Sequence, residues 1–487
     1  MSKDILKNSI TYTILGFLPL AFAFVFTPIY LKYMSNEQYG ILSLFLLYSS
    51  IFSHIIGLGV GKGFLFQYWD VYKDEEKLKK LISSTIGLIL IIQLIFISIG
   101  LLFDEFILSF IQKEDSDYSF RTFYILALFQ GAFLIFYEIF CYFYRNQEKL
   151  KQYAILNVGA LILFTIGSII GVIFLKMEAL GATYGRVIGY GIIIIFFLFY
   201  FIKKYGISLD LKISKALLVF SLPLFVNSVI GALGYGIDKI MIERLDTMEN
   251  LGIYSLALVF VSVLEIWLNS INNALNPTLY RYLNEKIVEK KEEIQGLVYL
   301  IITSVMLLIT IILALIYPVL ELIIPEEYHK VTTFLPILSV AFIWRVFSSI
   351  VVNSLYIKKK TKLFLFNEIT VLAGVILFGY FGYQFFGIVG IALAVYLVKL
   401  IEFILMNHLS RKTMALPFSL YKFYILTFIL TTSAFICSLL DKKGIINNYL
   451  LFLIPFLSLI ITYPLLMKYE IKRIWITIKY RKRIFFD

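Results

Sequence analysis

The chain has 487 residues, of which 60% are hydrophobic and only 16% are charged, and its mean hydropathy is +0.88. So small a polar fraction cannot cover a soluble globule of this length, and the composition therefore places the chain in a lipid bilayer. The net charge of +12 does not call for a nucleic-acid partner, because membrane topology explains an excess of basic residues.

Fourteen apolar runs are long enough to cross a membrane as helices. A spanning helix needs about 20 apolar residues, whereas a β-barrel would show short alternating segments. The runs cover residues 10–31, 40–61, 81–103, 122–144, 153–175, 181–202, 216–237, 251–273, 296–318, 334–357, 364–384, 387–406, 423–440 and 449–467. The sequence predicts an all-α polytopic membrane protein with about 14 transmembrane helices.

The basic residues predict the orientation of these helices. With the N-terminus inside, inner segments carry 32 of the 44 Lys and Arg residues and outer loops carry nine. Cytoplasmic loops retain positive charge, so we expect both termini to be cytoplasmic. The two cysteines, Cys141 and Cys437, fall in apolar runs and suggest neither a disulfide nor a metal site.

An internal repeat organises the first twelve runs. Residues 37–44, EQYGILSL, return as residues 249–256, ENLGIYSL, with five of eight positions identical and an offset of 212 (249 minus 37). Further matches in register are Tyr144 with Tyr356, Asn157 with Asn367, and Gly181 with Gly390. We therefore predict two six-helix lobes related by an axis along the membrane normal, a plan that suits a central transport path.

The predicted organisation has four parts. They are an N-terminal lobe at 1–210, a C-terminal lobe at 211–410, two added helices within 411–467, and a basic cytoplasmic tail at 468–487. The tail mixes basic residues with Ile471, Ile474 and Trp475, so it is either an interfacial helix on anionic lipid or a flank that only obeys the positive-inside rule. No loop exceeds roughly twenty residues, which leaves no room for the soluble domain that most membrane glycosyltransferases need, and we expect no enzyme.

Three basic residues lie inside the spanning runs. An ionisable group there costs about 2.5 to 3.5 kcal/mol and usually faces a cavity or a partner. Arg345 lies near the middle of run 334–357, where it either faces a lumen or pairs with a carboxylate. Arg186 and Lys399 lie closer to helix ends, from which each could extend to an interface. All three are candidates for binding an anionic substrate.

Polar residues at helical spacing predict inward faces. The face on run 251–273 and beyond holds Glu265, Asn269, Asn272 and Asn276; that on run 216–237 holds Asn227, Gly231, Gly234 and Asp238; and that on run 40–61 holds Ser50, His54, Gly57 and Gly61. Such faces line a pathway or pack helices together through small and polar residues. We favour pathway lining for the first of them. We predict that Asn227, Asn269, Asn272 and Asn276 bind the substrate, because amides suit sugar hydroxyls.

Any active transport must draw on an ion gradient, because the chain lacks an ATP site. Gly57 to Gly63 falls short of a phosphate loop, which needs four residues before Gly-Lys and then Ser or Thr. Glu265, His54 and Asp238 are the candidates for coupling to H+ or Na+. We expect no cofactor.

Two packing predictions accompany these candidates. Gly181, Gly185 and Gly189 form a four-residue glycine stripe, which is typical of a close helix contact. Glu138, Glu368 and Glu402 lie nearer helix ends, and Glu402 is three residues from Lys399, so we predict a mutual ion pair there.

Several short motifs resemble those of a known family. They are Thr27-Pro28-Ile29-Tyr30-Leu31, Glu37-Gln38-Tyr39-Gly40, Ser221-Leu222-Pro223-Leu224, Gly252-Ile253-Tyr254-Ser255, Asn276-Pro277-Thr278-Leu279-Tyr280 and Ile324-Pro325-Glu326-Glu327-Tyr328. The chain with these motifs resembles bacterial polysaccharide flippases of the Wzx type, which carry O-antigen or capsule repeat units and belong to the multidrug and toxin extrusion (MATE)-like superfamily.

The resemblance implies a function. It implies a two-lobed bundle in the bacterial inner (plasma) membrane. This bundle would move an undecaprenyl-pyrophosphate-linked oligosaccharide from the cytoplasmic to the outer leaflet by alternating access, alongside the glycan polymerase machinery. It also implies a cavity lined mainly by helices 1, 2, 7 and 8, with Arg345 at its edge. The alternatives are a small-molecule or drug antiporter of the same fold, for which Glu138 would be the carboxylate of the N-terminal lobe, and a membrane glycan polymerase.

Overall fold

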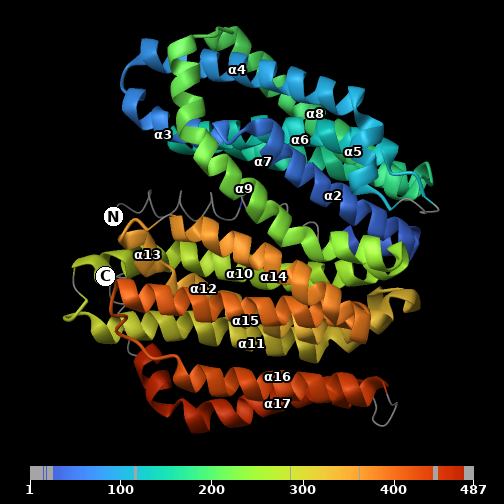
Figure 1. Ribbon diagram of the computed structural model, residues 1–487, viewed down its shortest axis with the longest axis vertical. Helices are drawn as coiled ribbons and strands as arrows, with labels where there is room; N and C mark the ends of the chain where they lie inside the picture. The colour runs from blue at the N-terminus through green and yellow to red at the C-terminus, as the bar shows by residue number, and fades with distance from the viewer. Residues whose placement is uncertain are drawn as a thin grey trace. The chain divides into compact units, whose positions relative to one another are not determined.

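The computed structural model describes residues 15, 18, 26–113, 118–285, 287–360, 362–442 and 448–475. All regular structure in these residues is helical (Figure 1). The chain divides into two compact units, Met1–Gly252 and Ile253–Asp487. The boundary between the units lies inside one helix, α10.

The first unit is built from eight α-helices in the part of it that the structure describes, with one π-helical segment. They are α2 (Asn36–Gly57), α3 (Val60–Val71), α4 (Glu75–Leu102), α5 (Asp104–Ile111), α6 (Arg121–Asn146), α7 (Leu150–Ile169), η1 (Ile170–Phe174), α8 (Glu178–Tyr205) and α9 (Leu211–Leu245). Because α9 packs against α2 and α3, this unit extends past residue 210. The lobe boundary that the repeat places at 210 stays a prediction about the duplication.

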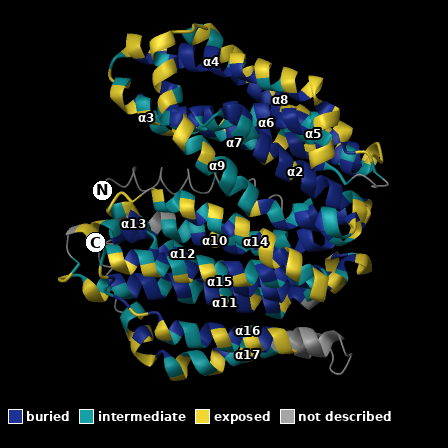
Figure 2. Cartoon of the chain, viewed as in Figure 1, coloured by how far each residue is buried: buried dark blue, intermediate teal, exposed yellow. Residues whose placement is uncertain are grey.

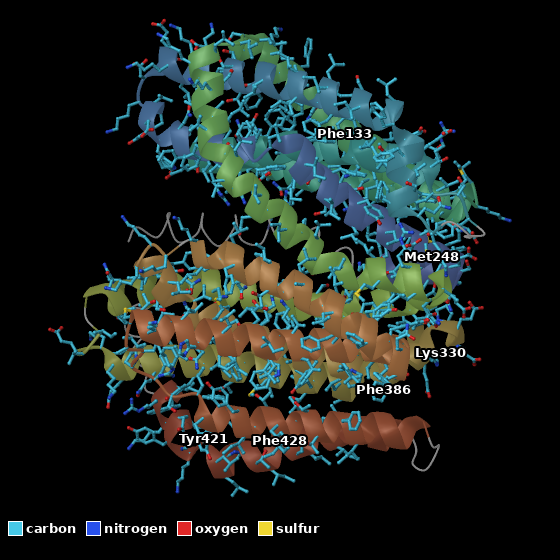
Figure 3. All side chains as sticks on the ribbon, in the orientation of Figure 1. Phe133, Met248, Lys330, Phe386, Tyr421 and Phe428 are labelled. Atoms are coloured by element: carbon cyan, nitrogen blue, oxygen red, sulfur yellow. The ribbon has the colours of Figure 1, made fainter. Side chains whose placement is uncertain are left out.

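The second unit continues from α10 to the last described residue. Its helices are α10 (Met248–Glu285), α11 (Lys291–Ile323), the 3-10 helix η2 (Glu326–Thr333), α12 (Leu335–Val351), α13 (Asn353–Ile357), α14 (Lys362–Phe386), α15 (Ile388–Thr413), α16 (Tyr421–Lys442) and α17 (Asn448–Leu466). Helices α16 and α17 run side by side, and the exposed Tyr421 and Phe428 both lie on α16 (Figure 3).

The lengths and composition of these helices confirm the all-α polytopic fold. Within the described residues, 11 helices are long and apolar enough to cross a membrane, or 12 if one bent pair counts as a span. The first predicted run, 10–31, lies mostly outside the described residues. The bent pair joins 454–466 to 468–475 at 84°, so the described start of the basic tail turns away from the direction of the last span.

The burial pattern separates core helices from helices at the lipid surface (Figure 2). Helices α2 and α12 are the most buried spans of the two units, with 72% and 78% of their apolar windows buried. On α4, by contrast, Leu94 and Leu102 are more than two-thirds exposed. An apolar face open on this scale fits contact with lipid chains.

One predicted helix is broken in the structure. Run 40–61 becomes α2 and α3, which are separated by Leu58 and Gly59, both in the left-handed region. Gly59 is needed there for two reasons: its φ is +70°, and a Cβ would lie 2.9 Å from the Ser221 carbonyl oxygen of α9. The predicted face that runs from His54 to Gly61 is therefore interrupted, because the two residues lie on different helices.

The glycine stripe forms the predicted close helix contact. Gly181 and Gly185 on α8 lie against the backbones of Gly171 and Gly167, and a Cβ on either would overlap those backbones. In the second unit Gly382 on α14 and Gly390 on α15 meet in the same way. The offsets between the two contacts are 211 (382 minus 171) and 209 (390 minus 181) residues, as a duplicated helix pair predicts.

The two copies of the repeated octapeptide also meet. Gly40 at the start of α2 faces the Met248 carbonyl oxygen, and Gly252 at the start of α10 faces the Asn36 carbonyl oxygen. Each copy thus contributes its glycine to one backbone-to-backbone contact in the first unit. The glycine of the repeat is required at both positions by this reciprocal packing.

We predict that Gly185→Ala destabilises the protein. The added Cβ must push α7 and α8 apart, and overpacking of this kind costs about 1 to 3 kcal/mol, more than the gain of at most ~1 kcal/mol in helix propensity. Thermal unfolding in detergent should show a lower midpoint. The matched control is Gly159→Ala, where the Cβ would lie 3.1 Å from the movable end of Ile193; equal midpoints for the two variants would contradict the assignment.

Candidate functional site

An ion pair joins the middles of two spanning helices in the second unit. The Arg345 guanidinium on α12 donates to Glu265 Oε1 on α10 at 2.9 Å. The Asn269 side-chain amide, one turn further along α10, donates to the same carboxylate oxygen at 3.3 Å. The predicted substrate ligand Arg345 and the predicted coupling residue Glu265 are thus direct partners.

This pair is not sealed in the core. The side chains of Arg345 and Glu265 are 36% and 21% exposed, although most other residues of α12 are buried. A guanidinium in the middle of a spanning helix does not face lipid, because the cost of that exposure is too large. An accessible surface of this kind suits a residue that can change partners.

The neighbours of Arg345 fix its helix firmly. Trp344 stacks on Phe403 of α15 with ring centroids 5.7 Å apart, and Phe347 contacts Phe403 and Tyr424 of α16. Helix α12 thus packs against α15 and α16 through aromatic rings. This packing leaves the guanidinium as the adjustable part of a rigid helix.

A second ion pair confirms the prediction from sequence spacing. Lys399 Nζ donates to Glu402 Oε2 at 2.8 Å along α15, and the Asn367 amide of α14 donates to the other carboxylate oxygen of Glu402 at 3.3 Å. Glu368, next to Asn367, interacts electrostatically with Glu402, Lys399 and Arg345. The two ion pairs and Glu368 are therefore one charged group of five side chains, which we call the C-unit network.

The polar face predicted on α10 extends along the helix beyond Glu265. Asn272 and Asn276 are half-buried on this helix, and Asn276 Oδ1 has no hydrogen-bond partner in the described part of the chain. One helical turn later the Tyr280 hydroxyl donates to Asn353 Oδ1 of α13 at 3.0 Å. Helix α10 thus continues through Asn276 rather than ending near residue 273.

A separate polar group lies in the first unit, around the break between α2 and α3. His54, in the last turn of α2, interacts electrostatically with Glu138 of α6 and Lys62 of α3. Glu138 accepts a hydrogen bond of 2.6 Å from the Tyr142 hydroxyl, and its carboxylate fits against Gly61. Lys62 Nζ donates to Ser228 Oγ of α9 at 2.6 Å.

The remaining predicted residues lie elsewhere in the first unit. The Arg186 guanidinium stacks over the rings of Phe164 and Tyr190, 4.9 and 5.7 Å from their centroids. Asn227 Oδ1 on α9 is buried without a hydrogen-bond partner among the described residues. Asp238 is buried and accepts from the Lys239 amide, while Lys239 Nζ donates to Ser43.

The structure therefore groups the predicted residues by unit. Glu265, Asn269, Arg345 and Lys399 belong to the C-unit network or touch it, whereas His54 joins a group that also contains Lys62 and Glu138. The sequence argument missed Lys62 as a functional residue because it considered the residue only as part of a phosphate loop. It also missed Asn367, whose placement in the internal repeat was the signal that could have singled it out.

A comparison with known families identifies the chain. The sequence profile described as "Polysaccharide biosynthesis protein" matches residues 5–283, more than half of the sequence. The chain belongs to the polysaccharide biosynthesis protein family. The family resemblance predicted from the motifs is confirmed, although no curated protein matches the sequence.

Solved structures show the same fold. The chain is similar to the lipid II flippase MurJ in an inward closed conformation, with a TM-score of 0.69, 18% identity, and coverage of 98% of this chain and 100% of MurJ. An inward-facing multidrug resistance transporter of the MATE family follows, with a TM-score of 0.65, 13% identity, and coverage of 83% and 97%. A MOP-superfamily transporter from Pyrococcus furiosus has a TM-score of 0.57 at 15% identity, with coverage of 84% and 94%. This family member is a multi-pass membrane protein with the fold of these transporters.

We predict that Arg345 and Glu265 are coupled energetically. Arg345→Ala leaves a carboxylate in the membrane without its partner, so it should destabilise more than the double variant with Glu265→Gln. Because both side chains are partly accessible, we expect a coupling energy on the order of 1 kcal/mol from thermal unfolding in detergent. The exposed pair of Lys80 and Glu76 is the control, with a coupling below about 0.5 kcal/mol; additive effects at Arg345 and Glu265 would refute the prediction.

Proposed function

We propose that the protein is a flippase that moves an undecaprenyl-pyrophosphate-linked oligosaccharide from the cytoplasmic to the outer leaflet of the inner membrane by alternating access. The observation that carries the proposal is the partly exposed ion pair of Arg345 and Glu265 in the middle of two spanning helices, in a member of the polysaccharide biosynthesis family. A flippase for this substrate needs a cation at membrane depth for the pyrophosphate. It also needs polar groups for the sugars.

Arg345 suits the pyrophosphate because a guanidinium binds phosphate oxygens through two parallel N–H donors. Before the substrate binds, Glu265 forms an ion pair with this guanidinium. When the pyrophosphate binds Arg345, it displaces Glu265, whose charge is then no longer neutralised by the guanidinium. An exchange of partners keeps Arg345 paired at every stage, and the displaced Glu265 then binds the coupling ion, which avoids the cost of a bare charge in the membrane.

The asparagines of α10 suit the glycan. Asn269, Asn272 and Asn276 are about one helical turn, or ~5 Å, apart, and each amide offers both a donor and an acceptor to sugar hydroxyls. Asn227 offers the same groups from the first unit. We assign Arg186 and Lys399 to the binding of the anionic headgroup at other stages of transport, because both can release a partner: an aromatic ring in one case and Glu402 in the other.

The ion gradient would act through titratable groups in each unit. Glu265 is the first candidate because substrate binding changes its partner. His54 and Asp238 are candidates in the first unit. There the imidazole of His54 interacts electrostatically with the carboxylate of Glu138 and with the ammonium of Lys62. The coupling ion is H+ or Na+, and the transported glycan passes to the glycan polymerase machinery.

A second candidate function is cation antiport of a small molecule or drug. The observation that favours it is Glu138, a carboxylate in a spanning helix of the first unit beside His54. Resistance of cells to cationic dyes that depends on Glu138 would support this function. Lys62 argues against it, because an ammonium in the same group repels a cationic substrate.

We predict that Arg345→Ala slows leaflet exchange. Purified protein in liposomes, with a fluorescent undecaprenyl-pyrophosphate oligosaccharide and an impermeant quencher, should show exchange that responds to an imposed pH or sodium gradient. Loss of the guanidinium should lower the rate at least about tenfold, the equivalent of ~1.4 kcal/mol, and Arg345→Lys should restore part of it.

The control for this experiment is Arg281→Ala, an exposed arginine near the end of α10, the helix that carries Glu265, which should keep the wild-type rate. Wild-type exchange by Arg345→Ala combined with Glu265→Gln, at equal expression, would exclude the assigned role of the pair. An absence of exchange by the wild-type protein with several glycans, together with gradient-driven dye uptake, would favour the antiporter.

A further inference from the structure

The C-unit network contains one more carboxylate than cations. Its cations are Arg345 and Lys399, and its carboxylates are Glu265, Glu402 and Glu368. Each cation already forms an ion pair with one carboxylate, at 2.9 and 2.8 Å. Glu368 is the remaining carboxylate, and among the described residues it makes no ion pair of its own.

The position of Glu368 makes a permanent negative charge costly. It lies six residues after Lys362 at the start of α14, about 9 Å along the helix, and it is half-buried. An ionised carboxylate at this depth needs a cation or several hydrogen-bond donors. Its near neighbour Glu402 has already engaged both Lys399 and the Asn367 amide.

We infer that Glu368 is the proton-carrying residue of the C-unit network, and that it carries a proton because the two cations are neutralised by Glu265 and Glu402. With that proton, the five side chains sum to zero charge. The inference deepens the proposed function, on which its role in transport rests, because a gradient-driven flippase needs a group that takes up and releases the coupling ion.

The surroundings of Glu368 favour a proton over a metal cation. Lys399 of α15 and Arg345 of α12 both act on Glu368, and each of them is already paired with another carboxylate. Glu402 of α15 and the Tyr356 hydroxyl of α13 are the other titratable groups that interact with it. In addition, no cluster of three or more acidic, histidine or cysteine side chains that could hold a metal was found in the described residues. A proton needs no such coordination shell.

The inference links Glu368 to the proposed exchange of partners. When a substrate anion binds the Arg345 guanidinium in place of Glu265, the network gains negative charge. Glu368 therefore holds its proton more tightly. When Arg345 returns to Glu265, Glu368 holds its proton less tightly. Substrate and proton thus favour each other's binding through the charge balance of one group, with no need for direct contact between them.

Infrared spectroscopy of the purified protein without substrate tests the proton directly. At pH about 7 ordinary carboxyl groups are ionised, so a protonated carboxyl in the membrane gives a separate carbonyl band that shifts in deuterated water. We expect that band in the wild type and its loss in Glu368→Gln. A band that persists in Glu368→Gln overturns the inference.

The charge count predicts a series of variants. Lys399→Gln leaves two surplus carboxylates and should increase the band about twofold, whereas Glu402→Gln balances the network and should abolish it. The double variant of Glu368→Gln with Lys399→Gln should restore the wild-type amplitude. A band unchanged by both Lys399→Gln and Glu402→Gln would mean that the network does not set the protonation of Glu368, and would also overturn the inference. Glu326→Gln, at an exposed residue of η2, is the matched control and should leave the band unchanged.

The transport assay separates this inference from the proposed function. In Glu368→Gln we expect the pH gradient to lose most of its effect, so that the ratio of exchange with the gradient to exchange without it falls about tenfold. Gradient-driven exchange at the wild-type rate in this variant contradicts the coupling role. If the infrared series holds and the wild-type protein shows no exchange, the proton site stands and the flippase assignment fails. If exchange occurs and the band is absent from the wild type, the flippase assignment stands and the proton site fails.

Discussion

The pairing of charges within the membrane is the constraint on which the described site depends. A cation or carboxylate in a spanning helix is tolerated only when another group compensates it, and the second unit meets this condition with two ion pairs on three helices. Arg345 and Glu265 come from helices 80 residues apart in sequence, whereas Lys399 and Glu402 lie on one helix. The first kind of pair ties two helices together, whereas the second lies within one helix and reaches α14 only through the hydrogen bond from Asn367 to Glu402.

Close helix contacts provide the frame around these charges. Apolar side chains gain little by leaving lipid for other apolar side chains, so spanning helices associate through small residues that let their backbones approach. Glycines do this at Gly171 with Gly181 and at Gly382 with Gly390, one contact in each unit. The frame is therefore specified by positions where any side chain would clash, and the adjustable groups, such as the Arg345 guanidinium, are attached to it.

The sequence predicted those features that depend on local spacing. The pair of Lys399 and Glu402 lies one helical turn apart, and the glycine stripe on α8 repeats every four residues, so both followed from the geometry of a single helix. The partner of Arg345 did not. Sequence spacing left open a lumen-facing arginine and an arginine paired with a carboxylate, and only the tertiary packing of α12 against its neighbours brings Glu265 to it.

The break between α2 and α3 was missed for a related reason. Leu58 has high helix propensity, and nothing in its apolar neighbours signals a left-handed residue. The signal lay in the glycines that follow it, whose role becomes clear only once α9 packs against Gly59 and Gly63. The tertiary contact with α9 thus overrides the helix propensity of Leu58. Because the helix breaks there, His54 and Gly61 do not share one continuous helix face.

An ion pair in a transporter can be structural and functional at the same time, and the two roles impose different physical requirements. A purely structural pair needs no access to water, because its two charges neutralise each other wherever they lie. A pair that exchanges partners needs a path by which the competing ion can approach. Arg345, with 36% of its side chain exposed on an otherwise buried helix, meets the second requirement. The uneven number of carboxylates beside it adds a second condition, because a group with a surplus charge responds to any change of partner by binding or releasing a proton. Together these are the two conditions that the proposed coupling of a substrate to a gradient requires of an ion pair.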